Sequence, residues 1–136
     1  MNIVFAGTPQ FAADHLKLLV DSQHEIKCIL TQPDRGSGRG KKVIPSPVKE
    51  IGINNGIEVL QPNSLKEESI VRSLESLKPD LLLVVAYGLL IPKKVLDIAE
   101  KGSINIHASI LPRWRGAAPM EYSIYSGDNE SGISYM

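Results

Sequence analysis

The chain has 136 residues, 43% of them hydrophobic, which suits one domain with a single core and excludes a disordered chain. Fifteen basic residues balance fifteen acidic ones, so only a local patch could attract nucleic acid, and no overall field favours a membrane surface. The single cysteine excludes an internal disulfide, and the apolar start over 3–6 is too short for a signal peptide or membrane span, so we expect a cytoplasmic protein.

The first thirty residues are predicted to form a strand, a helix and a second strand. The apolar run 3–6 predicts the first strand, and Thr8 with Pro9 then offers an N-cap hydroxyl and a proline suited to the first helical position. The second strand is indicated by apolar residues that alternate with polar ones, namely Ile26, Cys28 and Leu30. This order is a β-α-β unit, from which parallel sheets are built.

Residues 32–42 contain three glycines and almost nothing apolar, which predicts a long, mobile loop. Four positive charges against the one negative charge of Asp34 give the segment a local charge of plus three. The basic residues are Arg35, Arg39, Lys41 and Lys42. By itself this pattern fits a solvated surface loop as well as a loop that binds phosphates.

The middle of the chain continues to alternate between helix and strand signals. A proline-started helix is expected over 47–54, a short strand over 57–60, and then a helix opened by the capping-box pair Ser64 and Glu67. The continuous apolar run 81–86 predicts a strand that is buried on both faces, as the central strand of a parallel sheet is.

The last third adds a short helix from Pro92, a strand over 103–107, a helix over about 117–125 and a strand that begins at Ile133. Neither repeats nor linkers interrupt this order. We therefore expect residues 1–136 to form a single α/β domain, doubly wound around a mainly parallel sheet.

The segment that follows the 81–86 run is a first candidate site, because ligands of open parallel sheets bind beyond the carboxyl ends of the strands. Its residues are Tyr87, Gly88, Leu89, Leu90, Ile91 and Pro92. The glycine permits a sharp turn, and the aromatic and apolar side chains suit a flat, partly apolar pocket. The same side chains would also suit plain core filling beneath a turn.

A second candidate is the pair Asn105 and His107. Period two places them on one face of their strand, near its carboxyl end. An amide donor beside an imidazole can stabilise an oxyanion and move a proton, as acyl transfer to an amine requires. By itself the pair also fits two half-buried polar residues that hydrogen-bond to loop backbone.

Other catalytic signatures are missing from the sequence. Gly7 stands alone after the first strand, so neither a dinucleotide fingerprint nor a phosphate-binding P-loop follows it. No group of histidine, cysteine and carboxylate residues has metal-ligand spacing, and no Gly-x-Ser-x-Gly is present. We therefore expect neither a metal nor a nucleotide cofactor.

Six stretches, spread in order along the chain, resemble the methionyl-tRNA formyltransferases. They are IVFAGTPQFA (3–12), TQPDR (31–35), GRGKK (38–42), PSPVK (45–49), VVAYG (84–88) and, longest and most specific, NIHASILPRWRGAAP (105–119). The resemblance implies a Rossmann-like formyltransferase fold. It also implies the transfer, in translation initiation, of the formyl group of 10-formyltetrahydrofolate to the amino group of methionyl-initiator-tRNA.

Within that family, the residues that match Asn105 and His107 surround the formyl carbonyl, and the segment 87–92 matches the wall around the pterin ring. Further folate contacts are implied for Ser109, Ile110, Leu111 and Pro112. The resemblance also implies that the basic residues of segment 32–42 hold the acceptor end of the tRNA, which would let a neutral protein bind RNA.

The resemblance is incomplete at the C-terminal end. The family's third catalytic residue is an aspartate in a Leu-Asp-Thr-Gly-Asp motif after the strand that Ile133 begins, and a C-terminal β domain supplies a second tRNA surface; neither is found among these 136 residues. We therefore expect the chain to be an incomplete N-terminal formyltransferase domain that is inactive alone.

Two alternatives remain open on the sequence alone. One is another folate-dependent enzyme of the same fold, although a glycinamide ribonucleotide formyltransferase would carry a glycine-rich loop after the first strand. Formyltransferases of amino sugars and formyltetrahydrofolate hydrolase domains usually lack the insertion at 38–42. The other alternative, for the chain by itself, is a folate-binding module without catalysis.

Overall fold

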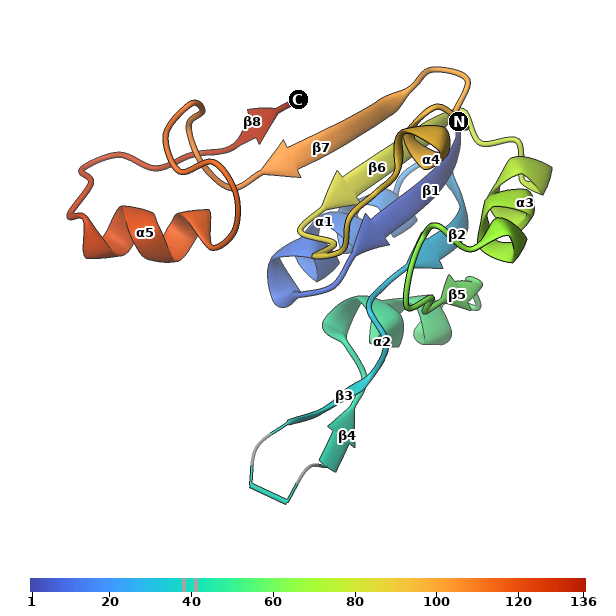
Figure 1. Cartoon of the computed structure of the whole chain (residues 1–136), viewed down its shortest axis with the longest axis horizontal. Helices are drawn as coiled ribbons and strands as arrows, with labels where there is room; N and C mark the ends of the chain where they lie inside the picture. The colour runs from blue at the N-terminus through green and yellow to red at the C-terminus, as the bar shows by residue number, and fades with distance from the viewer. Residues whose placement is uncertain (38, 41) are drawn as a thin grey trace.

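The structure is a computed structural model that describes residues 1–37, 39–40 and 42–136 (Figure 1). The strands are β1 (Asn2–Gly7), β2 (Glu25–Leu30), β3 (Arg35–Ser37), β4 (Lys42–Ile44), β5 (Val59–Leu60), β6 (Leu81–Val85), β7 (Ser103–His107) and β8 (Ser134–Tyr135). The helices are α1 (Gln10–Val20), α2 (Pro47–Asn54), α3 (Glu68–Ser76), α4 (Lys93–Leu96) and α5 (Pro119–Tyr125). No helix in the described ranges is long and apolar enough to cross a membrane.

Six of the strands form one sheet in the order β5-β2-β1-β6-β7-β8. All neighbours run parallel except β7 and β8, which are antiparallel. The predicted doubly wound, mainly parallel sheet is therefore confirmed, and β6 lies near its middle as the apolar run indicated. Because parallel strands point the same way, the carboxyl ends of β2, β1, β6 and β7 meet at one edge of the sheet.

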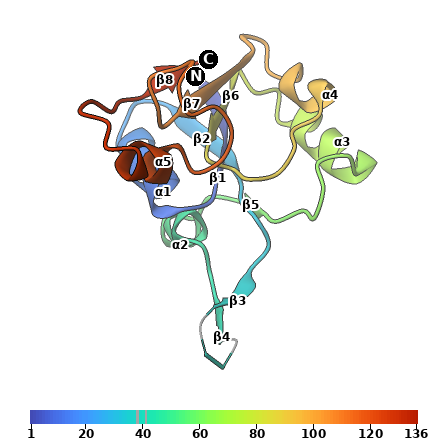
Figure 2. The ribbon, with the colours of Figure 1, turned by 60° about the vertical axis from the view of Figure 1, so that its left-hand side comes forward.

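Two apolar layers enclose the sheet, because successive residues of a strand point to opposite faces. On β1, Ile3 and Phe5 pack with α1 and α2, whereas Val4 and Ala6 pack with α3 and α4. Figure 2 shows α1 and α2 on one side of the strands and α3 and α4 on the other. Both faces of β1 and β6 are thus buried, which explains why these strands read as continuous apolar runs.

Two predicted helix starts were wrong. α1 begins after Pro9, and the hydroxyl of Thr8 does not cap it but donates to the carbonyl oxygen of Tyr87 at 2.9 Å. α3 begins after Glu67 without a side-chain cap, and the hydroxyl of Ser64 instead accepts a hydrogen bond from the backbone of Lys66. In both cases the hydroxyl forms a hydrogen bond with another backbone group, through tertiary packing for Thr8 and within a local turn for Ser64. It is then not available to cap the helix.

The largest correction concerns the segment predicted as a long loop. β3 and β4 form an antiparallel hairpin in which Arg35 pairs with Ile44 and Gly36 with Val43. The β-branched residues of β4 favour a strand, and Gly40, with a φ of +100°, serves the turn. The hairpin projects away from the sheet (Figure 1).

Smaller differences concern element lengths. The strand expected over 57–60 is only Val59–Leu60, and the helix expected from 117 begins at Pro119. The last strand, expected to begin at Ile133, begins one residue later. Such terminal shifts are common because helix and strand ends depend on hydrogen bonds that local patterns do not specify.

Substitution of Gly7 tests how tightly β1 is packed. A Cβ at this position would lie 2.7 Å from the Cβ of Ala12 and 2.8 Å from the carbonyl oxygen of Val85. We expect Gly7→Ala to lower the free energy of unfolding by about 1–3 kcal/mol, measured by urea denaturation, because overpacked strands must shift. Gly132→Ala is the control, since its nearest neighbour is the half-exposed side chain of Ile110. Equal stability of both variants would contradict the packing described.

Candidate active site

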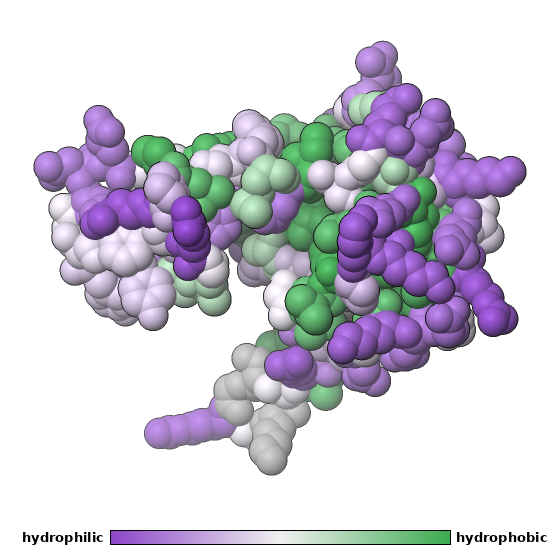
Figure 3. Space-filling model, turned by 45° about the horizontal axis from the view of Figure 1, so that its top comes forward, coloured by the Kyte–Doolittle hydropathy of each residue, from purple (hydrophilic) through white to green (hydrophobic). Residues whose placement is uncertain are grey.

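A cavity of about 680 Å³ opens at the carboxyl edge of the sheet, within the size range of small-molecule sites. Its wall combines the start of α1, the ends of β6 and β7 and the segment that leads into α5. The molecule is hollowed between the lobe that carries α5 and the rest of the domain (Figure 3). The lining residues are Pro9, Gln10, Phe11, Val84, Ala86, Tyr87, Gly88, Leu89, Asn105, Ile106, His107, Ala108, Gly116, Ala117, Ala118, Pro119, Met120 and Glu121.

The structure brings Asn105 and His107 together on the wall of this cavity, as the sequence predicted. The backbone of Asn105 is fixed on both sides, because its N–H and C=O pair with Met136 and its strand also pairs with β6. Its half-buried side-chain amide makes no hydrogen bond to any of the described residues. Because the backbone is fixed and the side-chain amide has no partner among the described residues, the amide can donate a hydrogen bond to a ligand.

The ring of the second polar group, His107, makes one hydrogen bond to the described residues, and this bond indicates which nitrogen carries the hydrogen. Its Nε2 lies 2.9 Å from the carbonyl oxygen of Trp114. Because a carbonyl oxygen only accepts, Nε2 must carry the hydrogen, and Nδ1 of the neutral ring is then the acceptor. This hydrogen bond therefore selects the tautomer of the imidazole that carries its hydrogen on Nε2.

The turn that follows β6 forms a fixed wall of the cavity. Ala86 and Gly88 have left-handed backbone angles, with φ of 47° and 85°. Between them, the carbonyl oxygen of Tyr87 accepts hydrogen bonds from Thr8 Oγ1 at 2.9 Å and from Gln32 Nε2 at 3.0 Å. A left-handed alanine is strained, and such strain persists where surrounding contacts hold the backbone, as these two hydrogen bonds do.

The side chain of Tyr87 points into the core rather than serving as an exposed aromatic face. It is 2% exposed and packs among the apolar residues between the sheet and the helices α3 and α4. Burial raises the pKa of Tyr87 to about 12, and its hydroxyl has no hydrogen-bond partner among the described residues. Tyr87 thus contributes to the site mainly as backbone and as support for the turn.

The structure divides the predicted folate-binding residues between several places. Tyr87, Gly88 and Leu89 line the cavity of Asn105 and His107, whereas Leu90 is 76% exposed and, with Ile91 and Pro92, lies outside its wall. The predicted segment of Ser109, Ile110, Leu111 and Pro112 lines a separate hollow of about 600 Å³. The two predicted segments therefore do not share one cavity in this structure.

That second hollow is bounded by a cluster around Asp128. Its carboxylate accepts two hydrogen bonds from Arg113, at 2.6 and 2.9 Å, and one from the indole of Trp114 at 2.6 Å. The indole also stacks on Tyr122, with ring centroids 5.6 Å apart. The hydrogen bonds from Arg113 and then from Trp114 hold the pKa of Asp128 well below its usual range. This cluster fixes the loop whose Trp114 carbonyl receives His107.

Part of the cavity wall was missed in the sequence. Pro9, Gln10 and Phe11 line it because they follow β1, whose carboxyl end meets the same edge as those of β6 and β7. That signal was available, since the position after the first strand of a parallel sheet is a usual ligand site. Ala118, with a left-handed φ of 55°, lines the cavity too, but no sequence pattern predicted it.

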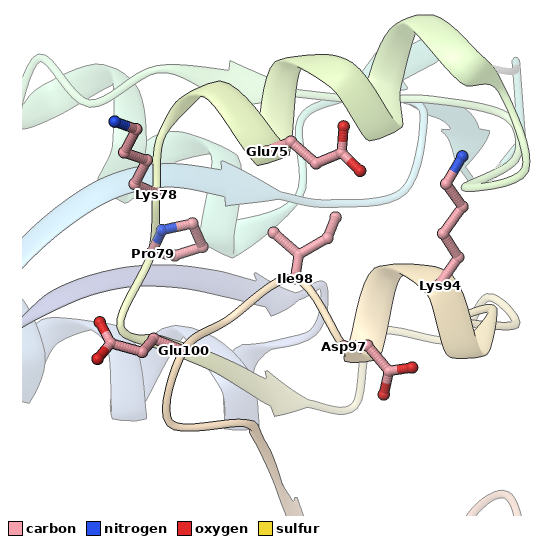
Figure 4. Close-up of a pocket in the computed structure, with 7 residues that line it drawn as sticks. All are labelled: Glu75, Lys78, Pro79, Lys94, Asp97, Ile98 and Glu100. Carbon is pink, nitrogen blue, oxygen red and sulfur yellow. The ribbon is translucent and has the colours of Figure 1, made fainter.

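A further hollow of about 530 Å³ lies at the opposite edge of the sheet, between α3 and α4 (Figure 4). Lys78 and Glu100 precede β6 and β7, so this hollow is at the amino ends of the strands. Its rim carries both signs of charge, because Glu75, Lys94 and Asp97 surround the apolar side chain of Ile98. It contains neither of the predicted catalytic residues, so the cavity at the carboxyl edge is the candidate active site.

Comparison with known proteins assigns a family to this arrangement. Residues 1–136 match the family described as formyl transferase. Two methionyl-tRNA formyltransferases, from Pseudomonas fluorescens (strain Pf0-1) and Ectopseudomonas mendocina (strain ymp), are each 57% identical over 136 residues. The alignments cover all of this chain but only 43% of those proteins, so the chain spans less than half of their length.

Solved structures of lower identity share the fold. Glycinamide ribonucleotide transformylase 1 from Symbiobacterium toebii superimposes with a TM-score of 0.75 at 14% identity, over 99% of this chain and 64% of that one. A formyltetrahydrofolate deformylase from Pseudomonas syringae pv. tomato has a TM-score of 0.71 at 17% identity, over 98% of this chain and 44% of that one. At these identities the likeness shows the fold alone.

The Asp128 cluster predicts a particular pH dependence. A carboxyl group whose pKa is lowered on folding stabilises the fold above its unfolded pKa, near 3.9, and loses that effect as the pH falls through the folded value. We therefore expect the emission of Trp114, the only tryptophan, to stay constant from pH 7 to about pH 4. Asp128→Asn should shift the emission at pH 7, and the control Asp21→Asn should not. If the Trp114 fluorescence of the unsubstituted chain changed with a midpoint near pH 4, the hydrogen bonds of Asp128 with Arg113 and Trp114 would be contradicted.

Proposed function

Because this chain belongs to the formyl transferase family, we propose that it is the folate-binding and catalytic portion of a methionyl-tRNA formyltransferase. The reaction is the transfer of the formyl group of 10-formyltetrahydrofolate to the amino group of methionyl-initiator-tRNA, in the cytoplasm. The observation that carries the proposal is the 57% identity to two proteins of that name along the whole chain. The cavity with Asn105 and His107 on its wall supports it.

The cavity suits a flat, partly apolar ligand with one reactive carbonyl. Phe11, Leu89 and Met120 supply apolar wall, and the held turn at 86–88 supplies backbone groups close to the ligand. When bound, 10-formyltetrahydrofolate provides the formyl carbon that the amine attacks. The amide of Asn105, which has no partner among the described residues, donates to the formyl oxygen as negative charge develops there.

The role of His107 follows from its ring. Attack by the amine on the formyl carbon leaves the attacking nitrogen with an extra proton, which Nδ1 of the neutral imidazole can take. As the bond between the formyl carbon and the folate nitrogen breaks, the imidazole can return this proton to the folate nitrogen, so that tetrahydrofolate leaves as a neutral amine. The hydrogen bond from Nε2 to the Trp114 carbonyl stabilises the resulting cation, because that carbonyl accepts in both protonation states. The Asp128 cluster holds Trp114, so it sets the position of this carbonyl.

The tRNA is proposed to meet the hairpin of β3 and β4. Arg35, Arg39 and Lys42 are exposed on it, and Lys41, the fourth predicted contact, lies outside the described residues. Exposed basic side chains on a projecting arm suit a phosphate backbone, where each contact releases counterions. Ser109 to Pro112 remain proposed folate contacts although they line the neighbouring hollow, which shares Trp114 with the His107 loop.

The alternative within the fold is another folate-dependent enzyme, such as a glycinamide ribonucleotide transformylase. The TM-score of 0.75 supports that likeness of fold, but the 14% identity to that structure is far below the 57% to the methionyl-tRNA formyltransferases. The alternative for the chain by itself is folate binding without turnover. His107 has no carboxylate partner among the described residues, which favours this second alternative for the isolated chain.

The proposal is tested by comparing the 136-residue chain with a chimera in which it replaces the matching part of the Pseudomonas fluorescens relative. Both should bind a tetrahydrofolate analogue in calorimetry, because the cavity lies within the chain. Only the chimera should formylate methionyl-initiator-tRNA rapidly, and the chain should be slower by several orders of magnitude, because His107 has no carboxylate partner among the described residues. A chimera that binds folate but formylates glycinamide ribonucleotide instead would overturn the proposal.

Within the chimera, Asn105→Ala tests the role of the amide. Loss of an oxyanion donor should lower kcat by a hundredfold or more, on the order of 3 kcal/mol, and should leave KM for folate nearly unchanged, because the donor acts mainly in the transition state. The control is Asn63→Ala, because Asn63 is exposed and does not line the cavity. An unchanged kcat with an altered KM would assign Asn105 a binding or structural role.

A further inference from the structure

The hairpin that carries the basic residues is held at its base by a half-buried ion pair. Asp34, the residue before β3, accepts hydrogen bonds from Lys49 Nζ of α2 and, at 2.8 Å, from Gln61 Nε2 after β5. The side chains of Lys49 and Asp34 are only 21% and 23% exposed. The hydrogen bonds from Lys49 and then from Gln61 lower the pKa of Asp34, so the carboxylate stays charged at neutral pH.

The other stem of the hairpin is tied down as well. Ser46, which follows β4 and caps α2, accepts from the backbone N–H of Lys49 at 3.0 Å, and its hydroxyl lies 2.8 Å from that of Thr31. Thr31 is fully buried at the end of β2. The two stems are thus fastened to the same helix turn and the same strand end.

Beyond its base, the described part of the hairpin is largely exposed. It projects from the domain in both ribbon views (Figures 1 and 2), and the apolar side chains of Val43 and Ile44 are 59% and 51% exposed. Packing of these side chains therefore does little to fix the direction of the arm, whereas Asp34 and Ser46 fasten both of its stems at the base.

The same base is joined to the wall of the candidate active site. Gln61 Nε2, which donates to Asp34, lies 3.1 Å from the carbonyl oxygen of Gln32, and Gln32 Nε2 donates to the carbonyl oxygen of Tyr87. The close approach of Gln32 needs a glycine next to Tyr87, because a Cβ on Gly88 would lie 2.0 Å from Gln32 Nε2. Hydrogen bonds thus run without interruption from the hairpin base to the cavity.

We propose that Asp34 is a positioning residue that aims the basic hairpin at the tRNA, and that Gln32 joins this clamp to the folate cavity. This proposal rests on the proposed function, in which the hairpin contacts RNA. Under this proposal, Asp34 affects RNA binding alone. Gln32 affects both RNA binding and folate binding, because it contacts Gln61 at the hairpin base and the Tyr87 carbonyl at the cavity wall.

The direction in which Asp34→Asn changes RNA affinity distinguishes this proposal from an effect of charge alone. Asp34 is a negative charge at the base of an arm that carries basic side chains, so its removal should strengthen RNA binding if charge alone matters. If Asp34 aims the arm, Asp34→Asn should weaken RNA binding on the order of tenfold, because a loosened arm must be ordered on binding. The two accounts predict opposite shifts of the same dissociation constant.

The experiment uses the 136-residue chain, an acceptor-stem RNA hairpin with a single-stranded 3′ end, and a tetrahydrofolate analogue. RNA affinity is measured by fluorescence anisotropy at several salt concentrations, and folate affinity by calorimetry. Asp34→Asn should raise the RNA Kd about tenfold and leave the folate Kd unchanged. Gln32→Leu should raise both, and Asp21→Asn, a distant carboxylate at the end of α1, should change neither.

Two further variants make failures distinguishable. Replacing Arg39, Lys41 and Lys42 with alanine should reduce the slope of RNA affinity against salt by about one per lost phosphate contact. If it does not, the RNA role of the hairpin fails, and the positioning role fails with it. If it does, but Asp34→Asn binds RNA equally or more tightly, only the positioning role is overturned. Should Asp34→Asn unfold, Gln61→Leu keeps the ion pair and must still weaken RNA binding.

Discussion

The rest of the structure depends on the parallel pairing of β1 with both β2 and β6. The strand is buried on both faces, and its two neighbours run in the same direction, so three strand ends reach one edge of the sheet side by side. β7 adds a fourth end through its pairing with β6. The groups proposed to act in the site, and the hydroxyls and amides that hold its wall, all lie at this edge.

The site combines a fixed backbone with free functional groups. Left-handed turns at Ala86 and Ala118, and the two hydrogen bonds to the Tyr87 carbonyl, hold the wall, while the amide of Asn105 keeps its donors available. Such preorganisation is what electrostatic stabilisation of a developing charge requires, because donors already in place need no reorganisation during the reaction. The strain at Ala86 is balanced by the two hydrogen bonds to the carbonyl oxygen of the neighbouring Tyr87.

The same edge explains how the proposed RNA contact is compatible with a net charge of zero. Basic side chains are placed on a hairpin that leaves the sheet after β2, and the carboxylate of Asp34, directly before β3, is neutralised by Lys49 at the base. Net charge along the chain therefore says little about the field at the arm. What matters is the segregation of basic residues to a projecting element, with the acid turned inward.

The sequence alone determined the class of the fold, the central position of the 81–86 strand and the placement of Asn105 and His107 on one face, because burial and two-residue periodicity leave direct traces in residue order. It did not determine that 32–42 contains a hairpin, that Thr8 and Ser64 are not caps, or that Ser109 to Pro112 lie apart from the Tyr87 turn. Those outcomes depended on which distant groups folding brought within hydrogen-bonding reach. A hydroxyl or a loop segment has several possible local partners, and only the tertiary structure decides among them.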